Sequence, residues 1–131
     1  MIKIYHRKRK DSSAVKAITW FNQHHIFFDY SLIGEITERD LRHILKLSNG
    51  FEELLRSRKS KVDGSDQTFF DYEELSTEEF IACILRHPKI LRTPLIFNDK
   101  KILVGYNDFE IRQFIPIAHR RVALLQNLTQ K

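Results

Sequence analysis

The order of strand-like and helix-like segments predicts an α/β fold in which helices cover one mixed sheet. Three observations support it: a strand–helix–strand unit at the start, a helical middle, and a hairpin with a helix near the end. A strand, a helix and a strand within about 30 residues form a βαβ unit with parallel strands. Strands from both ends of the chain can therefore share one sheet, with the helical middle, about 36–90, inserted between them.

The starting unit follows from hydrophobic periodicity. Residues 2–5 (IKIY) and 26–30 (IFFDY) have the composition of strands. Between them, over residues 14–21, apolar side chains recur at i, i+3, i+4 and i+7, which is the spacing of a helix. We expect Ser12 or Ser13 to cap this helix, because a serine hydroxyl accepts hydrogen bonds from the free amides at a helix N-terminus.

The middle of the chain carries two helix starts and one polar stretch. Thr37 with Asp40 forms a capping-box-like pair, and Ser76 with Glu79 forms the clearest capping box in the sequence. Residues 57–67 contain almost no apolar side chain, so we expect an exposed loop there.

Strands return in the last third of the chain. Residues 95–97 (LIF) and 102–104 (ILV) flank the turn NDKK, which predicts a β-hairpin, and Asn107 is expected to cap a following helix. The weakly amphipathic segment 117–131 is expected to fray. By the usual size prior, residues 1–131 form a single domain.

Composition indicates a soluble protein. Hydrophobic residues make up 42% and charged residues 30%, and no window approaches ~18 uncharged apolar residues. With no signal-peptide pattern, we expect a cytoplasmic protein without membrane contact, monomeric when free. The 22 Lys and Arg outnumber the 17 Asp and Glu, which suits an acidic partner but does not by itself indicate nucleic acid.

The single cysteine restricts the chemistry. Cys83 excludes an internal disulfide and any two-cysteine redox centre, and no Cys/His spacing suits zinc. It falls in a helix pattern beside Phe80 and Ile84, where a small apolar filler is expected. We therefore expect no metal site and no cofactor.

A longer motif carries a specific resemblance. Residues 90–116, ILRTPLIFNDKKILVGYNDFEIRQFIP, resemble the C-terminal signature of the Spx and arsenate reductase family. Further matches are Tyr5, Trp20, residues 41–55 and Arg58. The resemblance implies a thioredoxin-like fold with a helical insertion lobe and a cis peptide bond at Thr93-Pro94. Length and motif order match the Spx-type regulators more closely than the enzymes.

The loop after the first strand departs from the family pattern. There the family's enzymes place a cysteine, and Spx-type regulators keep a CxxC redox switch, but this loop, residues 7–13, is RKRKDSS. Arsenate reduction needs a sulfur that bonds to arsenic and is then oxidised to a disulfide. Asp11 would also put negative charge where an oxyanion should bind. We therefore expect no catalytic residue and no enzyme. The enzymatic alternative is a diverged arsenate reductase or glutaredoxin-like protein that uses Ser12, Ser13 or an external thiol.

Positive charge replaces the thiol in this loop. Lysine and arginine side chains of this kind contact DNA phosphates or acidic surfaces, although a solvated loop is the plain alternative. By the resemblance, two further arginines lie near the loop; surface salt bridges are their plain alternative. The predicted DNA or anion contacts are Arg7, Lys8, Arg9, Lys10, Arg58 and Arg92.

The resemblance also implies a partner. Spx proteins bind the C-terminal domain of the RNA polymerase α subunit, and a glycine of the insertion is central to that contact. Gly50 falls at that position, where a missing side chain allows close approach; a helix C-cap is the alternative role. The predicted contacts around it are Leu47, Phe51 and Leu54, with Arg39, Arg42 and Lys46 as a charged rim.

These expectations combine into one leading hypothesis. The chain is predicted to be a bacterial, Spx-like stress-response transcription regulator that modulates promoter or activator contacts from the polymerase α subunit, with promoter DNA in the complex. It would lack a redox switch of its own. A protein adaptor that does not bind polymerase is a third hypothesis.

Overall fold

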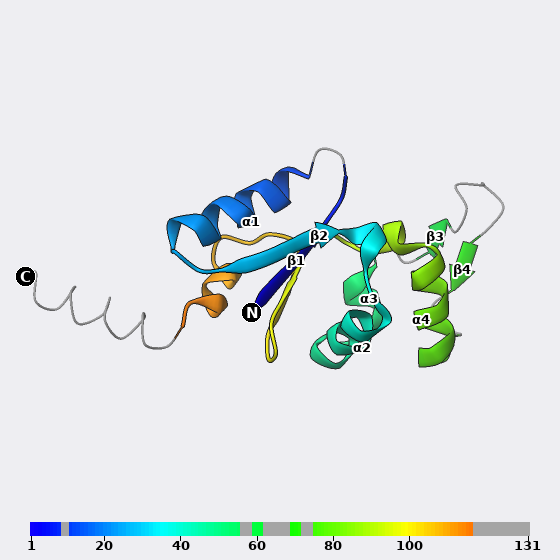
Figure 1. Cartoon of the computed structure of the whole chain (residues 1–131). Coiled ribbons are helices and arrows are strands. Elements are labelled where there is room, and N and C mark those ends of the chain that lie inside the picture. Colours follow the sequence, from blue (N-terminus) through cyan, green and yellow to red (C-terminus); the bar gives the residue numbers. More distant parts are fainter. Residues whose placement is uncertain (9–10, 56–58, 62–68, 72–74, 117–131) are drawn as a thin grey trace, which may run out of the picture.

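A four-stranded mixed sheet forms the centre of the computed structural model, which describes residues 1–8, 11–55, 59–61, 69–71 and 75–116 (Figure 1). The strand order is β2-β1-β5-β6. The strands are β1 (Ile2–His6), β2 (Phe28–Leu32), β5 (Leu95–Phe97) and β6 (Ile102–Val104). β1 pairs with β2 in parallel and with β5 antiparallel, and β5 pairs antiparallel with β6. The predicted mixed sheet is confirmed.

Helices cover both faces of this sheet. In Figure 1, α1 lies on one side and α2, α3 and α4 lie on the other. The α-helices are α1 (Ser12–Gln23), α2 (Glu38–Leu47), α3 (Phe51–Leu54) and α4 (Thr77–Arg86). The described residues also form the short 3-10 helices η1 (Ile33–Glu35), η3 (Pro88–Ile90) and η4 (Glu110–Phe114). A separate antiparallel pair consists of β3 (Lys59–Lys61) and β4 (Phe69–Asp71).

The alternation of side chains along each strand divides the core in two. Ile4 and Ile96 pack with Phe21 of α1, whereas their neighbours Tyr5 and Leu95 pack on the opposite face with α2, α3 and α4. Successive strand residues point to opposite faces, so every central strand contributes to both cores. The lobe that follows β2 is therefore anchored to the sheet through its own apolar cluster.

Several expected details differ from the structure. Neither Ser12 nor Ser13 caps α1: the N-cap is Asp11, whose carboxylate accepts a hydrogen bond from the Ala14 amide at 3.2 Å. Asn107 accepts amide hydrogen bonds as predicted, but the element that follows is the 3-10 helix η4. β2 begins two residues later than expected.

Part of the polar stretch 57–67 forms a strand and not the exposed loop that its composition predicts. Residues 59–61 form β3 and pair with 69–71, because main-chain hydrogen bonding does not require apolar side chains. The rest of that stretch, and the predicted fraying of 117–131, lie outside the described residues. Within those residues, each helix is too short or too polar to traverse a lipid bilayer.

Candidate functional site

The turn between α2 and α3 presents Gly50 to solvent. Gly50 has φ 127° and ψ 179°, a conformation that essentially only glycine adopts. A Cβ at this position would meet no atom within 4 Å. The alternative role of Gly50 as a helix C-cap is wrong, because Ser48 is the C-cap of α2 and Gly50 is the N-cap of α3. The main chain at Gly50 is therefore open to close approach by another molecule.

Side-chain hydrogen bonds hold this turn. The Ser48 hydroxyl donates to the Leu45 carbonyl at 3.2 Å. On the other side, the amide of Asn49 donates to Oε2 of Glu53 at 2.8 Å. The turn is thus tied both to the end of α2 and to α3.

Apolar residues around the turn differ in their access to solvent. Phe51 stacks on the buried Phe80, with ring centroids 3.9 Å apart and planes 2° apart. Phe51 and Leu47 are half-buried, and each packs against the lobe core. Leu54 is fully buried, so its predicted contact with a partner is wrong in this conformation. Its side chain packs into the core because α3 turns that position inward.

The cations of α2 are not equivalent. Arg39 and Lys46 are exposed, as a charged rim requires. Arg42 instead donates two 2.8 Å hydrogen bonds to Glu78 of α4 and a 3.2 Å bond to Glu38. The bonds from Arg42 hold the pKa of Glu78 below its usual value. Arg42 therefore ties α2 to α4, and its charge is already paired.

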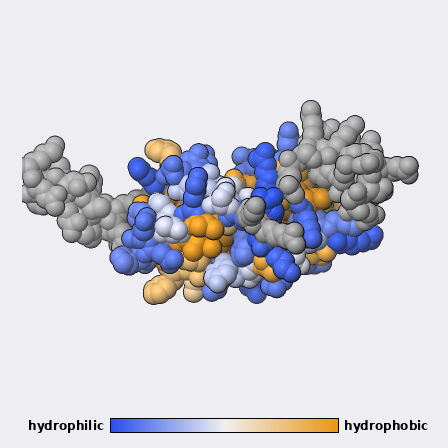
Figure 2. All heavy atoms as spheres, turned by 90° about the horizontal axis from the view of Figure 1, so that it is seen from above, coloured by the Kyte–Doolittle hydropathy of each residue, from blue (hydrophilic) through white to orange (hydrophobic). Residues whose placement is uncertain are grey.

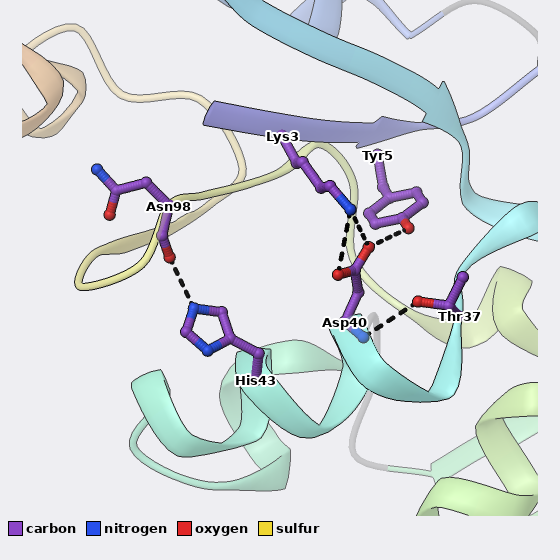
Figure 3. Close-up of polar contacts among 6 residues, drawn as sticks. All are labelled: Lys3, Tyr5, Thr37, Asp40, His43 and Asn98. Atoms are coloured by element: carbon purple, nitrogen blue, oxygen red, sulfur yellow. Dashed lines mark hydrogen bonds and ion pairs between the residues drawn. The ribbon is translucent and has the colours of Figure 1, made fainter. Parts of the chain in front are cut away.

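The inner side of α2 is joined to the sheet by polar contacts (Figure 3). The Asp40 carboxylate accepts a 2.6 Å hydrogen bond from the Tyr5 hydroxyl and a 3.0 Å bond from Lys3. Its own amide donates to the Thr37 hydroxyl, which caps α2 as predicted. One turn further along, a ring nitrogen of His43 lies 2.7 Å from the Asn98 carbonyl. The lobe is thus held to β1 and to the β5–β6 turn.

Ionisation in this network follows from burial and hydrogen bonding. Burial raises the pKa of Asp40, but the bonds from Tyr5 and Lys3 outweigh it and keep the pKa below its usual value. Burial, and then the same carboxylate, raise the pKa of Tyr5 well above 10. Asp40 is therefore ionised and Tyr5 neutral at neutral pH.

The loop after β1 contains a buried carboxylate, that of Asp11. The two oxygens of Asp11 accept hydrogen bonds from the amides of Ala14 and Arg7, at 3.2 and 3.0 Å. Asp11 is almost fully buried. It occupies the Ala14 amide, one of the groups at the start of α1 to which an external anion could otherwise bind.

Two predicted anion contacts lie together beside this loop. Arg7 and Arg92 line one open hollow of about 330 Å³ with Thr93, Val104 and Gly105. Nε of Arg7 is buried and has no hydrogen-bond partner among the described residues. Lys8 and Arg92 are exposed. The Thr93-Pro94 bond is cis, as the resemblance implied.

The remaining members of the predicted basic set, Arg9, Lys10 and Arg58, lie outside the described residues.

Cys83 is half-buried on α4, and burial raises the pKa of its thiol. The described part of the chain contains no group of three or more histidine, cysteine or acidic side chains suited to hold a metal ion.

On the face seen in Figure 2, hydrophobic residues come to the surface in patches separated by hydrophilic ones. Single exposed apolar side chains are ordinary on a soluble protein surface. The candidate site is defined by the open main chain at Gly50 and by the exposed cations Arg39 and Lys46 on α2.

Comparison with known proteins places this geometry in a family. The ArsC family profile matches residues 5–114. The chain belongs to the ArsC family. Among its relatives, the "Global transcriptional regulator Spx 2" of Lactococcus lactis subsp. lactis is 37% identical over 119 residues, which cover 88% of this chain and 86% of that protein.

Solved structures of ArsC-related proteins share the fold. A crystal structure of an ArsC-family-related protein from Bacteroides fragilis matches with a TM-score of 0.63 and 20% identity, covering 86% of this chain and 95% of that one. Arsenate reductase from Vibrio cholerae matches with a TM-score of 0.58 and 18% identity, over 86% and 92% of the two chains. The thioredoxin-like fold implied by the resemblance is therefore confirmed.

Sequence reasoning missed the residues that hold the site in place. Glu53 and Glu78 were not singled out, although the spacing of Asn49 to Glu53 resembles a capping box displaced by one residue. The Tyr5–Asp40 contact joins positions 35 apart in the sequence and leaves no local signal.

Proposed function

We propose that this chain is a transcription regulator that binds the C-terminal domain of the RNA polymerase α subunit through the surface around Gly50. Docked there, it would modulate promoter or activator contacts without a redox switch of its own. The single observation that carries the proposal is the open main chain at Gly50, in a chain whose relative is named a global transcriptional regulator. A partner can approach this main chain closely because no side chain covers it.

The charged residues near Gly50 support the chemistry of such a contact. Arg39 and Lys46 are exposed on α2, while Leu47 and Phe51 expose part of their apolar surface beside the turn. A small apolar centre with a polar rim is the usual anatomy of a protein–protein interface. The partner surface is therefore expected to carry acidic groups opposite α2.

The absence of a redox switch is supported by the loop itself. A thiol-based switch needs a reactive cysteine, and residues 7–13 contain none. Asp11 already fills the position between Arg7 and α1 through two amide hydrogen bonds. The proposal is that binding of the partner does not depend on oxidation of residues 7–13.

The deciding experiment measures binding of the chain to purified α subunit, with and without its C-terminal domain, by isothermal titration calorimetry. Gly50→Arg is expected to abolish binding, because the guanidinium would project into the space the partner occupies. Gly50→Ala is the matched control: it imposes the same unfavourable φ but adds only a methyl group. Equal binding by wild type and Gly50→Arg, or no binding by wild type, would contradict the proposal.

Promoter DNA would meet the basic loop within the complex. Replacing Arg7 to Lys10 by alanine is expected to weaken DNA association and reduce its salt dependence, while α binding persists. Unchanged promoter complexes at low salt would exclude the loop as a DNA contact.

The enzymatic alternative rests on the arsenate reductase fold shared with the Vibrio cholerae protein. It predicts turnover of arsenate with glutathione by the folded chain. The adaptor alternative predicts a bound protein other than polymerase in a partner screen. Neither alternative gives Gly50 the role of a polymerase contact.

A further inference from the structure

We infer that Glu53 is a positioning residue that fixes the Gly50 turn in the shape required for docking; the inference rests on the function proposed above. The observation is the 2.8 Å hydrogen bond from the Asn49 amide to Oε2 of Glu53, which spans the glycine. Glu53 occupies the third position of α3, counted from its N-cap Gly50. Its side chain therefore reaches back over the turn to the residue that precedes the cap.

The turn needs such a restraint because of its glycine. Glycine visits a wider range of φ and ψ than any other residue, so an unrestrained Gly50 would sample many conformations. If the partner binds only one of these conformations, its apparent affinity is reduced by the fraction of the protein that adopts that conformation. A hydrogen bond from Asn49 to a fixed acceptor restricts those conformations before the partner arrives.

Glu53 is fixed because α3 is anchored to the lobe at several points. Phe51 stacks on Phe80, and Leu54 is fully buried. The Leu54 carbonyl also accepts a 2.7 Å hydrogen bond from the Arg92 amide. The helix is only four residues long, so these tertiary contacts, rather than helix propensity, hold the carboxylate in place.

A neighbouring residue provides the matched comparison. Glu52 belongs to the same turn of α3 and carries the same charge, but its side chain is exposed, whereas Glu53 is half-buried. Removing either carboxylate changes the net charge equally. A difference between the two positions therefore reports the contact with Asn49 and excludes a general electrostatic effect.

The test compares Glu53→Gln with Glu53→Met in the full chain. The two side chains have similar length and no charge, but only glutamine retains an oxygen that can accept the Asn49 hydrogen bond. Binding to the purified α subunit is measured by calorimetry. Glu53→Met is expected to raise Kd about tenfold, which corresponds to about 1.4 kcal/mol, and Glu53→Gln to stay within about twofold of wild type. Glu52→Met and Glu52→Gln should both bind as wild type does.

Hydrogen exchange of the Asn49 amide supplies a second readout. It should accelerate in Glu53→Met but not in Glu52→Met, with the unfolding midpoint nearly unchanged. If Glu53→Met fails to fold, Glu53→Ala replaces it against Glu53→Gln. Faster exchange with unaltered α binding would overturn the positioning role while leaving the proposed function intact. Failure of the wild type to bind α would instead overturn the proposed function, and the docking role of Glu53 with it.

Discussion

The hydroxyl of Tyr5 donates a 2.6 Å hydrogen bond to Oδ2 of Asp40 and so joins β1 of the sheet to α2 of the lobe. Lys3, two residues earlier on the same strand, bonds to the same carboxylate at 3.0 Å. Asp40 is only 7% exposed, so its charge depends on these donors. These contacts fix the orientation of α2, which precedes the Gly50 turn, relative to the sheet.

Replacing Asp40 with asparagine is expected to lower the free energy of unfolding by about 2 kcal/mol. Hydrogen bonds to a charged group are worth roughly 1.5 to 3 kcal/mol, and the half-exposed Lys3 contributes the smaller share. Urea unfolding followed by circular dichroism measures the change. Asp29→Asn, at an exposed site on β2, is the control and should unfold as wild type does. Equal midpoints for both variants would show that the network adds no stability.

Acid should remove the contribution of Asp40. Its folded-state pKa lies below the usual 3.8, so its stabilising effect is present above about pH 4 and is lost as the pH falls through the folded-state value. The difference in unfolding free energy between wild type and Asp40→Asn should therefore be constant at neutral pH and narrow as the pH falls below about 4. A difference that stays constant down to the acid limit of the folded state would contradict the assigned ionisation.

Replacing Asp11 with alanine is expected to destabilise the chain by about 1 kcal/mol, because α1 loses its N-cap and the Arg7 amide loses its acceptor. The thermal midpoint should fall by roughly 4 °C. Asp11→Ser keeps a capping oxygen and should lose less. Identical midpoints for alanine and serine would argue against the capping role.

Oxidation should leave binding to the polymerase α subunit unchanged. The sequence contains only Cys83, which is half-buried on α4, and burial raises the pKa of its thiol, so little reactive thiolate is present at neutral pH. Calorimetry before and after treatment with diamide tests this. A loss of binding that Cys83→Ser prevents would reveal a thiol switch outside the loop.

Local patterns predicted much of the fold. The capping box at Ser76 and Glu79 is present with both of its hydrogen bonds, and the hairpin strands occur at the predicted residues. Each depends on contacts within a few residues, where spacing and side-chain chemistry are sufficient. The sequence predicts Ser12 or Ser13 as the N-cap of α1, whereas the structure has Asp11. Serine and aspartate are both good N-caps, so the sequence does not distinguish them and the geometry of the loop decides.

The sequence alone determined the strand–helix–strand start, the two capped helices of the middle and the later hairpin, and it placed no cysteine in residues 7–13 and a glycine at position 50. Only the tertiary structure decided that Leu54 is buried, that Arg42 is paired with Glu78, and that Asp40 accepts a hydrogen bond from Tyr5. The physical reason is the distance along the chain over which each interaction acts. Backbone preference and helix capping act between neighbours in the chain, whereas burial and charge pairing depend on which distant segments the folded core brings together.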